Sequence, residues 1–333
     1  MSGSATSAFG TVMAPRMVVA ATRDGIYEDV RVVATGPLDL HPASHALHYG
    51  STCFEGLKAH AGVDDKVRLF RPDRHAERLR ASAALLSLPV PPVETVAQAL
   101  REAVSANLDV VPASPGALYL RPVLLGTDPN IGAAAAPSTE ALLYVLASPV
   151  GDYFRGDGGL TLAIETELPR TTPQFGQVKC GANYAMALGV TRRARAEHGA
   201  DQVLFAPGGD VQETGAANFV LIDDRRVVTK ALDGSFLHGV TRDSILTLAR
   251  DLGYAVEERD LPIDEVLAWA EHGEAALAGT AAVLAPVGAF VHQGRRVAVG
   301  DGAMGPNTAR LRRALLAIQR GEAADPHGWT QPV

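Results

Sequence analysis

The order of strand-like and helix-like segments limits this chain to two mixed α/β halves. Strands are predicted at residues 17–21, 30–34, 67–70, 117–124 and 141–147, and helices at 72–88 and 93–108. After the break come strands at 160–164, 202–205, 219–222 and 275–278, with helices at 182–198, 239–253 and 311–319. The break itself, residues 151–159, contains four glycines and a charge cluster, which is typical of a linker. We therefore predict a small N-terminal α/β domain at 1–150, a linker at 151–159 and a larger C-terminal domain at 160–333.

The amino-acid composition and the net charge indicate which kinds of molecule this protein binds. The 333 residues are 47% hydrophobic and 20% charged, which suits a globular protein with buried cores. A net charge of −7 without a basic block argues against nucleic acid or an acidic membrane as a partner. Cys53 and Cys180 form neither a disulfide framework nor a CxxC metal motif, and the N-terminus lacks a signal-peptide pattern. We expect a cytoplasmic protein that acts on small molecules and holds no metal.

The chain uses lysine sparingly. Of 30 Lys and Arg residues only four are lysines, which leaves 26 arginines. One of the four, Lys179, is followed by Tyr184 and later by Glu213. A lysine in an enclosed apolar site loses its proton readily and can form a Schiff base with an aldehyde. This amine, phenol and carboxylate together predict a site for pyridoxal phosphate.

A phosphate site is predicted at the helix that starts near Val240 and Thr241. The first turn of a helix offers free N–H groups and the positive end of the helix dipole, which together favour an anion. Arg78 and Thr280 are candidates for a further charge-assisted bond and a hydroxyl contact. Thr241 alone is equally compatible with a simple helix cap.

Several runs in one order resemble the branched-chain amino acid aminotransferases, a family of fold-type IV pyridoxal-phosphate enzymes. The matching runs are residues 48–58, 69–79, 119–124, 179–184, 213–218, 237–241, 279–282 and 325–329. Together they span nearly the whole chain. The resemblance implies a two-domain architecture with the cofactor between the domains, and a homodimer.

The resemblance also implies roles for the cofactor-site residues. Lys179 is expected to form the Schiff base and to move a proton between the substrate α-carbon and the cofactor. Glu213 is expected to pair with the pyridinium nitrogen, so that the ring can act as an electron sink. Tyr184 is expected to bind the phenolic oxygen. The phosphate is expected to contact Arg78, Val240, Thr241 and Thr280.

A second set of residues is implied for the substrate. Tyr119, with the backbone of Thr280 and Ala281, is expected to receive the substrate carboxylate, and Arg121 to position neighbouring tyrosines. Tyr49, Phe54 and Tyr153 are expected to line the side-chain pocket, although aromatic residues of this kind equally suit a core or an interface.

The departures from the family pattern concern the substrate. The usual Gly-Gly-x-Gly turn before the lysine is replaced by residues 173–177, Pro-Gln-Phe-Gly-Gln, and Met13 stands where an aromatic residue is common. Because Met is more adaptable than Phe, the apolar pocket is expected to be reshaped. The predicted reaction is transfer of the amino group of L-leucine, L-isoleucine or L-valine to 2-oxoglutarate by a ping-pong route.

Several alternatives stay open on the sequence. One is an aminotransferase of a specialised secondary pathway that acts on a non-proteinogenic hydrophobic amino acid. A lyase of the aminodeoxychorismate type and a D-amino acid transaminase share the scaffold. A non-catalytic homologue is disfavoured by the intact set of Lys179, Tyr184 and Glu213.

Overall fold

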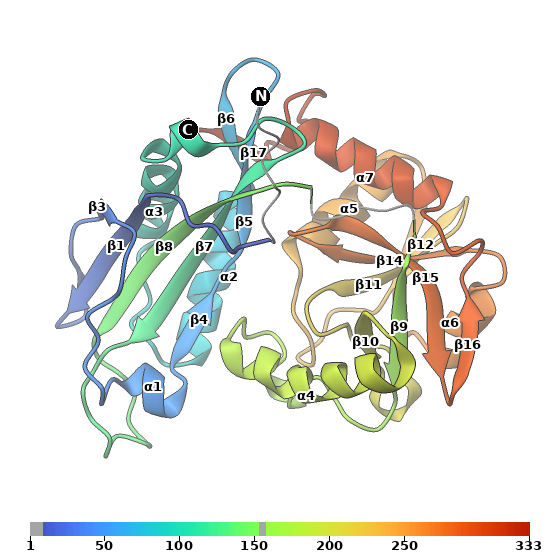
Figure 1. Cartoon of the computed structure of the whole chain (residues 1–333), viewed down its shortest axis with the longest axis horizontal. Helices are drawn as coiled ribbons and strands as arrows, with labels where there is room; N and C mark the ends of the chain where they lie inside the picture. The colour runs from blue at the N-terminus through green and yellow to red at the C-terminus, as the bar shows by residue number, and fades with distance from the viewer. Residues whose placement is uncertain (1–8, 153–157) are drawn as a thin grey trace. The chain divides into compact units, whose positions relative to one another are not determined.

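The computed structural model describes residues 9–152 and 158–333, and it forms two compact units. The first unit contains Met1–Tyr153, Val178–Gly181 and Ile318–Val333, and the second contains Phe154–Gln177 and Ala182–Ala317. Each unit is built on one large β-sheet with helices packed on it, so the predicted mixed α/β fold class is confirmed (Figure 1). Segments 178–181 and 318–333, which the sequence placed in the C-terminal domain, cluster with the first unit.

The first unit has a nine-stranded sheet in the order β17-β6-β5-β7-β8-β1-β2, with β3 paired to β1 and β4 paired to β7. Its strands are β1 (Arg16–Arg23), β2 (Ile26–Tyr27), β3 (Arg31–Ala34), β4 (Thr52–Phe54), β5 (Leu57–Ala61), β6 (Val67–Phe70), β7 (Ala117–Gly126), β8 (Ala141–Val150) and β17 (Thr330–Pro332). All of these pairings are antiparallel. Its helical segments are α1 (His45–Tyr49), α2 (Pro72–Leu85), α3 (Val93–Ser105) and the 3-10 turn η1 (Leu108–Val110).

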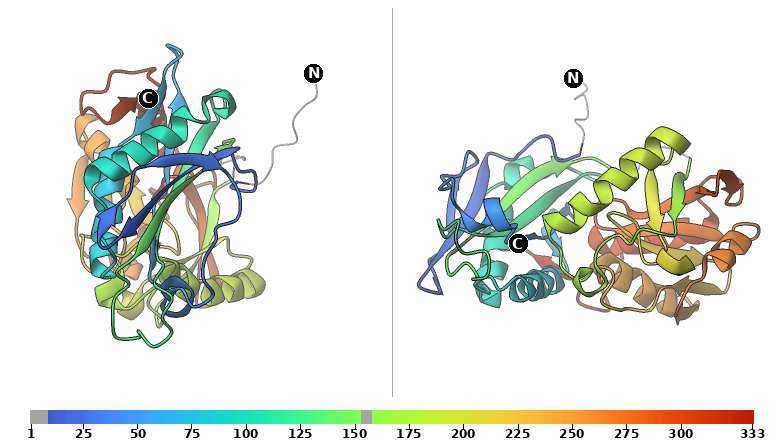
Figure 2. Two further views of the ribbon diagram at one scale, coloured as in Figure 1. Left: turned by 90° about the vertical axis from the view of Figure 1, so that its left-hand side faces the viewer. Right: turned by 90° about the horizontal axis from the view of Figure 1, so that it is seen from below.

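Two helices cover one face of this sheet, and successive residues of β7 alternate between that face and the opposite one. Helices α2 and α3 pack beside each other over the strands (Figures 1 and 2) and share one hydrophobic core with them. Leu118 and Leu120 of β7 point into that core and are fully buried. Since neighbouring residues of a strand face opposite sides, Tyr119 and Arg121 lie on the face away from the helices.

The second unit has an eight-stranded sheet in the order β10-β9-β15-β14-β11-β12-β13, with β16 paired to β15. Its strands are β9 (Leu160–Glu165), β10 (Gln202–Phe205), β11 (Asn218–Ile222), β12 (Arg226–Thr229), β13 (Ala255–Glu258), β14 (Glu274–Gly279), β15 (Val283–His292) and β16 (Arg295–Ala298). Strand β9 pairs in parallel with β10 and β15, β12 pairs in parallel with β13, and the remaining pairs are antiparallel.

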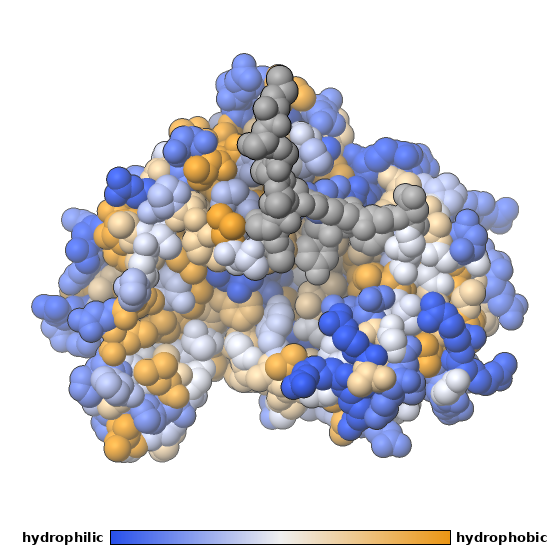
Figure 3. Space-filling view, viewed as in Figure 1, coloured by the Kyte–Doolittle hydropathy of each residue, from blue (hydrophilic) through white to orange (hydrophobic). Residues whose placement is uncertain are grey.

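The helices that alternate with these strands along the chain are buried to different extents. They are α4 (Gly181–His198), α5 (Val240–Asp251), α6 (Ile263–Trp269) and α7 (Pro306–Gln319), with 3-10 turns η2 (Pro173–Phe175) and η3 (Pro207–Gly209). Helix α5 buries eight of its twelve residues, which fixes its first turn firmly. Helix α4 buries only Asn183, Ala187 and Ala194, so most of its length is exposed. Hydrophilic residues dominate the face of the units seen in Figure 3, with apolar residues in smaller groups.

Most long elements agree with their sequence predictions. Predicted strand 202–205 is β10, and predicted helices 72–88 and 239–253 are α2 and α5. Residues 45–49 form the short helix α1 before the turn at Gly50, whose φ is +64°. The short strands β2, β4, β5, β12, β13, β16 and β17 carry few residues from which to read a pattern and were not predicted. The ten-residue strand β15 was not predicted either. Among the residues that the structure describes, no helix is both long and apolar enough to span a membrane.

Candidate active site

The backbone of Lys179 is fixed against two elements of the first unit. Its carbonyl oxygen accepts a hydrogen bond from the N–H of Phe54 at 2.9 Å, and its own N–H donates to Oγ of Ser82 on α2 at 3.0 Å. Val178 and Cys180 on either side are each 1% exposed. The Nζ atom lies 5.0 Å from the centre of the Phe54 ring, a cation–π distance. The amine is therefore held by a rigid backbone and packed against an aromatic ring.

Three of the predicted substrate residues form one cluster on the face of the first sheet that lies away from α2 and α3. Nη2 of Arg121 donates to the Tyr119 hydroxyl at 2.9 Å, and the Arg121 guanidinium carbon lies 4.8 Å from the Phe54 ring centre. Gly56 makes room for this arrangement, because a Cβ atom there would lie 2.0 Å from the Tyr119 hydroxyl oxygen. The Phe54-Glu55-Gly56 run thus contributes an aromatic wall and the space for the phenol.

Arg78 belongs to a buried charge cluster on α2. Its Nε and Nη2 donate to the two carboxylate oxygens of Glu55 at 2.6 and 2.9 Å. His75 Nδ1 lies 2.7 Å from Glu55 Oε2. Burial alone would raise the pKa of Glu55, but Arg78 and His75 outweigh it and hold the pKa well below its usual range. Burial lowers the pKa of His75, and the neighbouring Glu55 carboxylate partly opposes that shift.

Glu213 is the buried carboxylate of the second unit. Its side chain is buried, and the residue is 2% exposed. The backbone of Glu213 lies beside β10, where its carbonyl oxygen accepts a hydrogen bond from the Phe205 N–H at 3.0 Å. Its side-chain oxygens accept hydrogen bonds from the Leu237 N–H and from Nδ2 of Asn218, both at 3.0 Å. Nη1 of Arg170 lies 2.7 Å from Oε1, which makes an ion pair. The carboxylate is therefore held on both oxygens.

Tyr184 lies in the first turn of α4, half-buried, with the Arg170 guanidinium carbon 5.4 Å from its ring centre. The preceding residue, Asn183, accepts a hydrogen bond from the Thr171 hydroxyl at 2.7 Å and donates to the Phe175 carbonyl at 2.9 Å. The unusual run 173–177 is thereby tied to the start of α4 through the 3-10 turn η2. Arg170 brings Tyr184 and Glu213 of the predicted set together.

The predicted phosphate contacts of the second unit lie at backbone turns. Val240 and Thr241 open α5, and the residue before them, Gly239, provides no side-chain cap. A Cβ atom on Gly239 would lie 2.0 Å from Oδ1 of Asn218, the same residue that holds Glu213. Thr280 lies with Ala281 in the tight turn between β14 and β15, where both residues are half-buried. These positions offer N–H groups of the kind that bind an anion.

One predicted pocket residue stands apart from these clusters. Tyr49, at the end of α1, is 38% exposed and donates its hydroxyl hydrogen to the Ile131 carbonyl oxygen. Tyr153 lies outside the described residues.

Comparison with known proteins decides the family. Residues 52–290 match the model of the amino-transferase class IV family. The chain is 39% identical over 98% of its length, and 92% of the relative's, to a probable branched-chain-amino-acid aminotransferase of Streptomyces coelicolor. It is 37% identical, with the same shares covered, to branched-chain-amino-acid aminotransferase 2 of Bacillus subtilis. The chain belongs to the class IV aminotransferases.

Solved structures of this family share the fold. The T.th. branched-chain amino acid aminotransferase with pyridoxamine 5'-phosphate matches with a TM-score of 0.79 at 27% identity, over 96% of this chain and 98% of that one. The enzyme of Thermoproteus uzoniensis with norvaline matches with a TM-score of 0.77 at 26% identity, over 95% and 99%. The predicted resemblance and the fold class are confirmed, and this class IV aminotransferase is an enzyme of the transferase group.

Sequence reasoning missed residues that support the predicted site of this aminotransferase. Glu55, His75 and Asn218 stood inside matched runs without an assigned role. Arg170 carried no local signal, because it is one of 26 arginines and its partner is 43 residues further along the chain.

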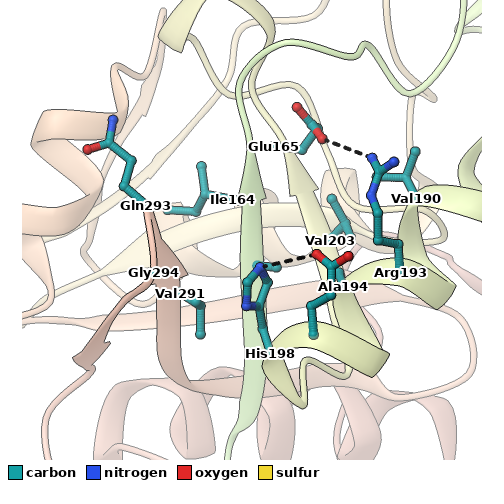
Figure 4. Close-up of a pocket in the computed structure, with 12 residues that line it drawn as sticks. Ile164, Glu165, Val190, Arg193, Ala194, His198, Val203, Val291, Gln293 and Gly294 are labelled. Atoms are coloured by element: carbon teal, nitrogen blue, oxygen red, sulfur yellow. Dashed lines mark ion pairs between the residues drawn. The ribbon is translucent and has the colours of Figure 1, made fainter.

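A surface hollow elsewhere on the second unit holds none of the predicted site residues. It lies between β9, α4 and β15 and is lined by the Glu165–Arg193 pair and by His198 beside Glu197 (Figure 4). Among the described residues no group of three or more His, Cys, Asp or Glu side chains is arranged to hold a metal.

The Glu55 cluster gives a prediction about stability. Glu55→Gln removes the charge that Arg78 faces, and breaking a buried ion pair costs about 3–5 kcal/mol at pH 7. Glu77→Gln is the matched control, since Glu77 pairs with Arg74 on the exposed side of the same helix and such pairs contribute at most about 1 kcal/mol. Urea unfolding of the three proteins measures both effects.

The difference in the free energy of unfolding between the native protein and Glu55→Gln should depend on pH. The stabilisation by ionised Glu55 is complete above the unfolded pKa of about 4.3 and is lost as the pH falls further toward the lower folded pKa. The stability gap between the native protein and Glu55→Gln should stay constant above about pH 5 and then shrink by up to about 1.4 kcal/mol per pH unit. A gap that stays constant down to pH 3 contradicts this account.

Proposed function

We propose that this aminotransferase moves the amino group of L-leucine, L-isoleucine or L-valine to 2-oxoglutarate with pyridoxal phosphate as cofactor. The two substrates would be used in turn, donor first and acceptor second. The observation that carries the proposal is the buried, doubly held carboxylate of Glu213 in a chain whose Lys179 is fixed by its backbone. The names of the relatives from Streptomyces coelicolor and Bacillus subtilis support the substrate class.

The donor set fits the chemistry of this cofactor. The carboxylate of Glu213 is 2% exposed and already forms an ion pair with Arg170, and it suits a protonated ring nitrogen as a second positive partner. The helix start at Val240 and Thr241, which has no side-chain cap, suits a phosphate group. The half-buried amine of Lys179 suits an aldehyde.

Each cofactor-site residue would then have one task. When bound, pyridoxal phosphate supplies an aldehyde for the amino group and a ring that withdraws electrons from the substrate α-carbon. Lys179 Nζ would move the proton at that carbon. Glu213 would accept the hydrogen bond of the ring nitrogen, and Tyr184 would bind the phenolic oxygen. The phosphate would contact Arg78, Val240, Thr241 and Thr280.

The substrate would be recognised by polar contacts at one end and apolar contacts at the other. Tyr119, held by Arg121, would receive the carboxylate together with the N–H groups of Thr280 and Ala281. Phe54 would line the side-chain pocket, and we assign Tyr49 and Tyr153 to the same pocket.

The direct test is Lys179→Ala. Because the proton at the α-carbon loses its carrier, turnover of L-leucine with 2-oxoglutarate should fall by about 10³-fold or more, while weak cofactor binding remains. Lys66→Ala, at a side chain that is 64% exposed, should leave turnover unchanged. Substantial transamination by Lys179→Ala would refute the mechanism.

We further propose a cytoplasmic homodimer. Helix α4 exposes Met186 and Leu188, at 49% and 59%, beside exposed Ala182, Ala185 and Gly189. An exposed apolar helix face of this kind commonly covers a partner. The buried free thiols of Cys53 and Cys180 support a reducing compartment, which cell fractionation can test.

A charge placed on α4 tests the dimer. Leu188→Glu would bury a carboxylate in the proposed contact, so the mass in solution, measured by light scattering at micromolar concentration, should fall from that of a dimer to that of one chain. Arg192→Glu, at an exposed position on the same helix, is the control and should remain dimeric. A native protein of single-chain mass, or a dimeric Leu188→Glu variant, contradicts this proposal.

A further inference from the structure

One buried arginine of the second unit contacts both residues that the proposed function assigns to the cofactor ring. Arg170 lies after β9 and is 2% exposed. Its Nη1 is 2.7 Å from Glu213 Oε1, and its guanidinium carbon is 5.4 Å from the Tyr184 ring centre. Its Nε and Nη2 donate to the Gly215 carbonyl oxygen at 3.3 and 3.2 Å. The guanidinium is thus fixed on three sides.

The groups described around the Glu213 carboxylate differ in charge. The Leu237 N–H and the Asn218 amide are neutral, and Asn218 is itself tied to the Leu237 carbonyl at 2.8 Å. Arg170 contributes a full positive charge. A carboxylate that is 2% exposed needs such a charge, since an unpaired buried ion costs several kcal/mol.

We propose that Arg170 is a positioning residue that neutralises Glu213 before the cofactor binds and then shares this carboxylate with the protonated ring nitrogen. The inference rests on the proposed function. Two positive groups on one carboxylate repel each other, so Arg170 weakens the attraction between Glu213 and the protonated ring nitrogen. Through its contact with the Tyr184 ring it also sets the orientation of the phenol.

The planar shape of arginine matters for this role. One guanidinium reaches Glu213, the Gly215 carbonyl and the Tyr184 face at once, because its five N–H groups form a rigid fork and its plane stacks on aromatic rings. A lysine at the same position keeps the charge but loses the fork and the stacking. The two properties can therefore be separated by substitution.

The test compares two probes on the apoprotein: pyridoxal phosphate and its carbocyclic analogue, in which carbon replaces the ring nitrogen. In the native protein Arg170 neutralises the charge of the Glu213 carboxylate, whichever probe is bound. In Arg170→Met, pyridoxal phosphate brings Glu213 a positively charged partner and the analogue does not. The dissociation constant of the analogue divided by that of pyridoxal phosphate should therefore be about tenfold or more higher in Arg170→Met than in the native protein. Arg170→Lys should stay near the native ratio, and so should the control Arg192→Met, at an exposed arginine of α4.

A double variant covers the case in which Arg170→Met does not fold. Removing both charges in Arg170→Met/Glu213→Gln leaves no unpaired carboxylate, so apoprotein stability should recover above that of Arg170→Met. A double variant as unstable as the single one would overturn the inference. So would an unchanged probe ratio in a folded Arg170→Met.

The outcomes for the two proposals are distinct. A native protein that binds neither probe refutes the proposed function, and the role of Arg170 with it. A native protein that binds pyridoxal phosphate and turns over L-leucine, while Arg170→Met keeps the native probe ratio, refutes the role of Arg170 alone.

Discussion

Pairing of buried charge is the constraint on which the candidate site depends. Each unit encloses a carboxylate that is almost inaccessible to water, Glu55 in the first and Glu213 in the second. Each forms an ion pair with an arginine, Glu55 with Arg78 and Glu213 with Arg170. Because the cost of an unpaired buried charge is several kcal/mol, these pairs fix side chains that would otherwise sample many rotamers. His75, Asn218 and Tyr184 contact these two pairs.

The backbone adds the second source of order. The two-residue period of β7 places Tyr119 and Arg121 on one face, opposite the core formed with α2 and α3. Lys179 is held at its backbone N–H and C=O, so the point from which its side chain extends is fixed. Rigid supports of this kind favour catalysis because reacting groups need little reorganisation.

The sequence predicted the parts of this arrangement that are written in local patterns. Long strands and helices such as β7 and α5 were found because their hydrophobic pattern is clear, and Lys179 stood out because lysine is rare in this chain. Arg170 could not be predicted, since its partner Glu213 is brought to it by the pairing of β9 with β10 and by the return of the chain opposite Phe205. The grouping of residues 178–181 with the first unit likewise depends on a contact, the Phe54 N–H to the Lys179 carbonyl, that has no local signature.

The most direct measurement is the absorbance spectrum of the cofactor-loaded protein before and after L-leucine, L-isoleucine or L-valine is added without an amino acceptor. The account predicts that the band of the lysine-bound cofactor is replaced by that of its pyridoxamine form, since the donor half-reaction needs no second substrate. An unchanged band with all three amino acids, in a protein shown to hold the cofactor, would contradict the branched-chain assignment. The replaced loop at Gln174 and the residue Met13 would then be the first positions to examine for a different donor.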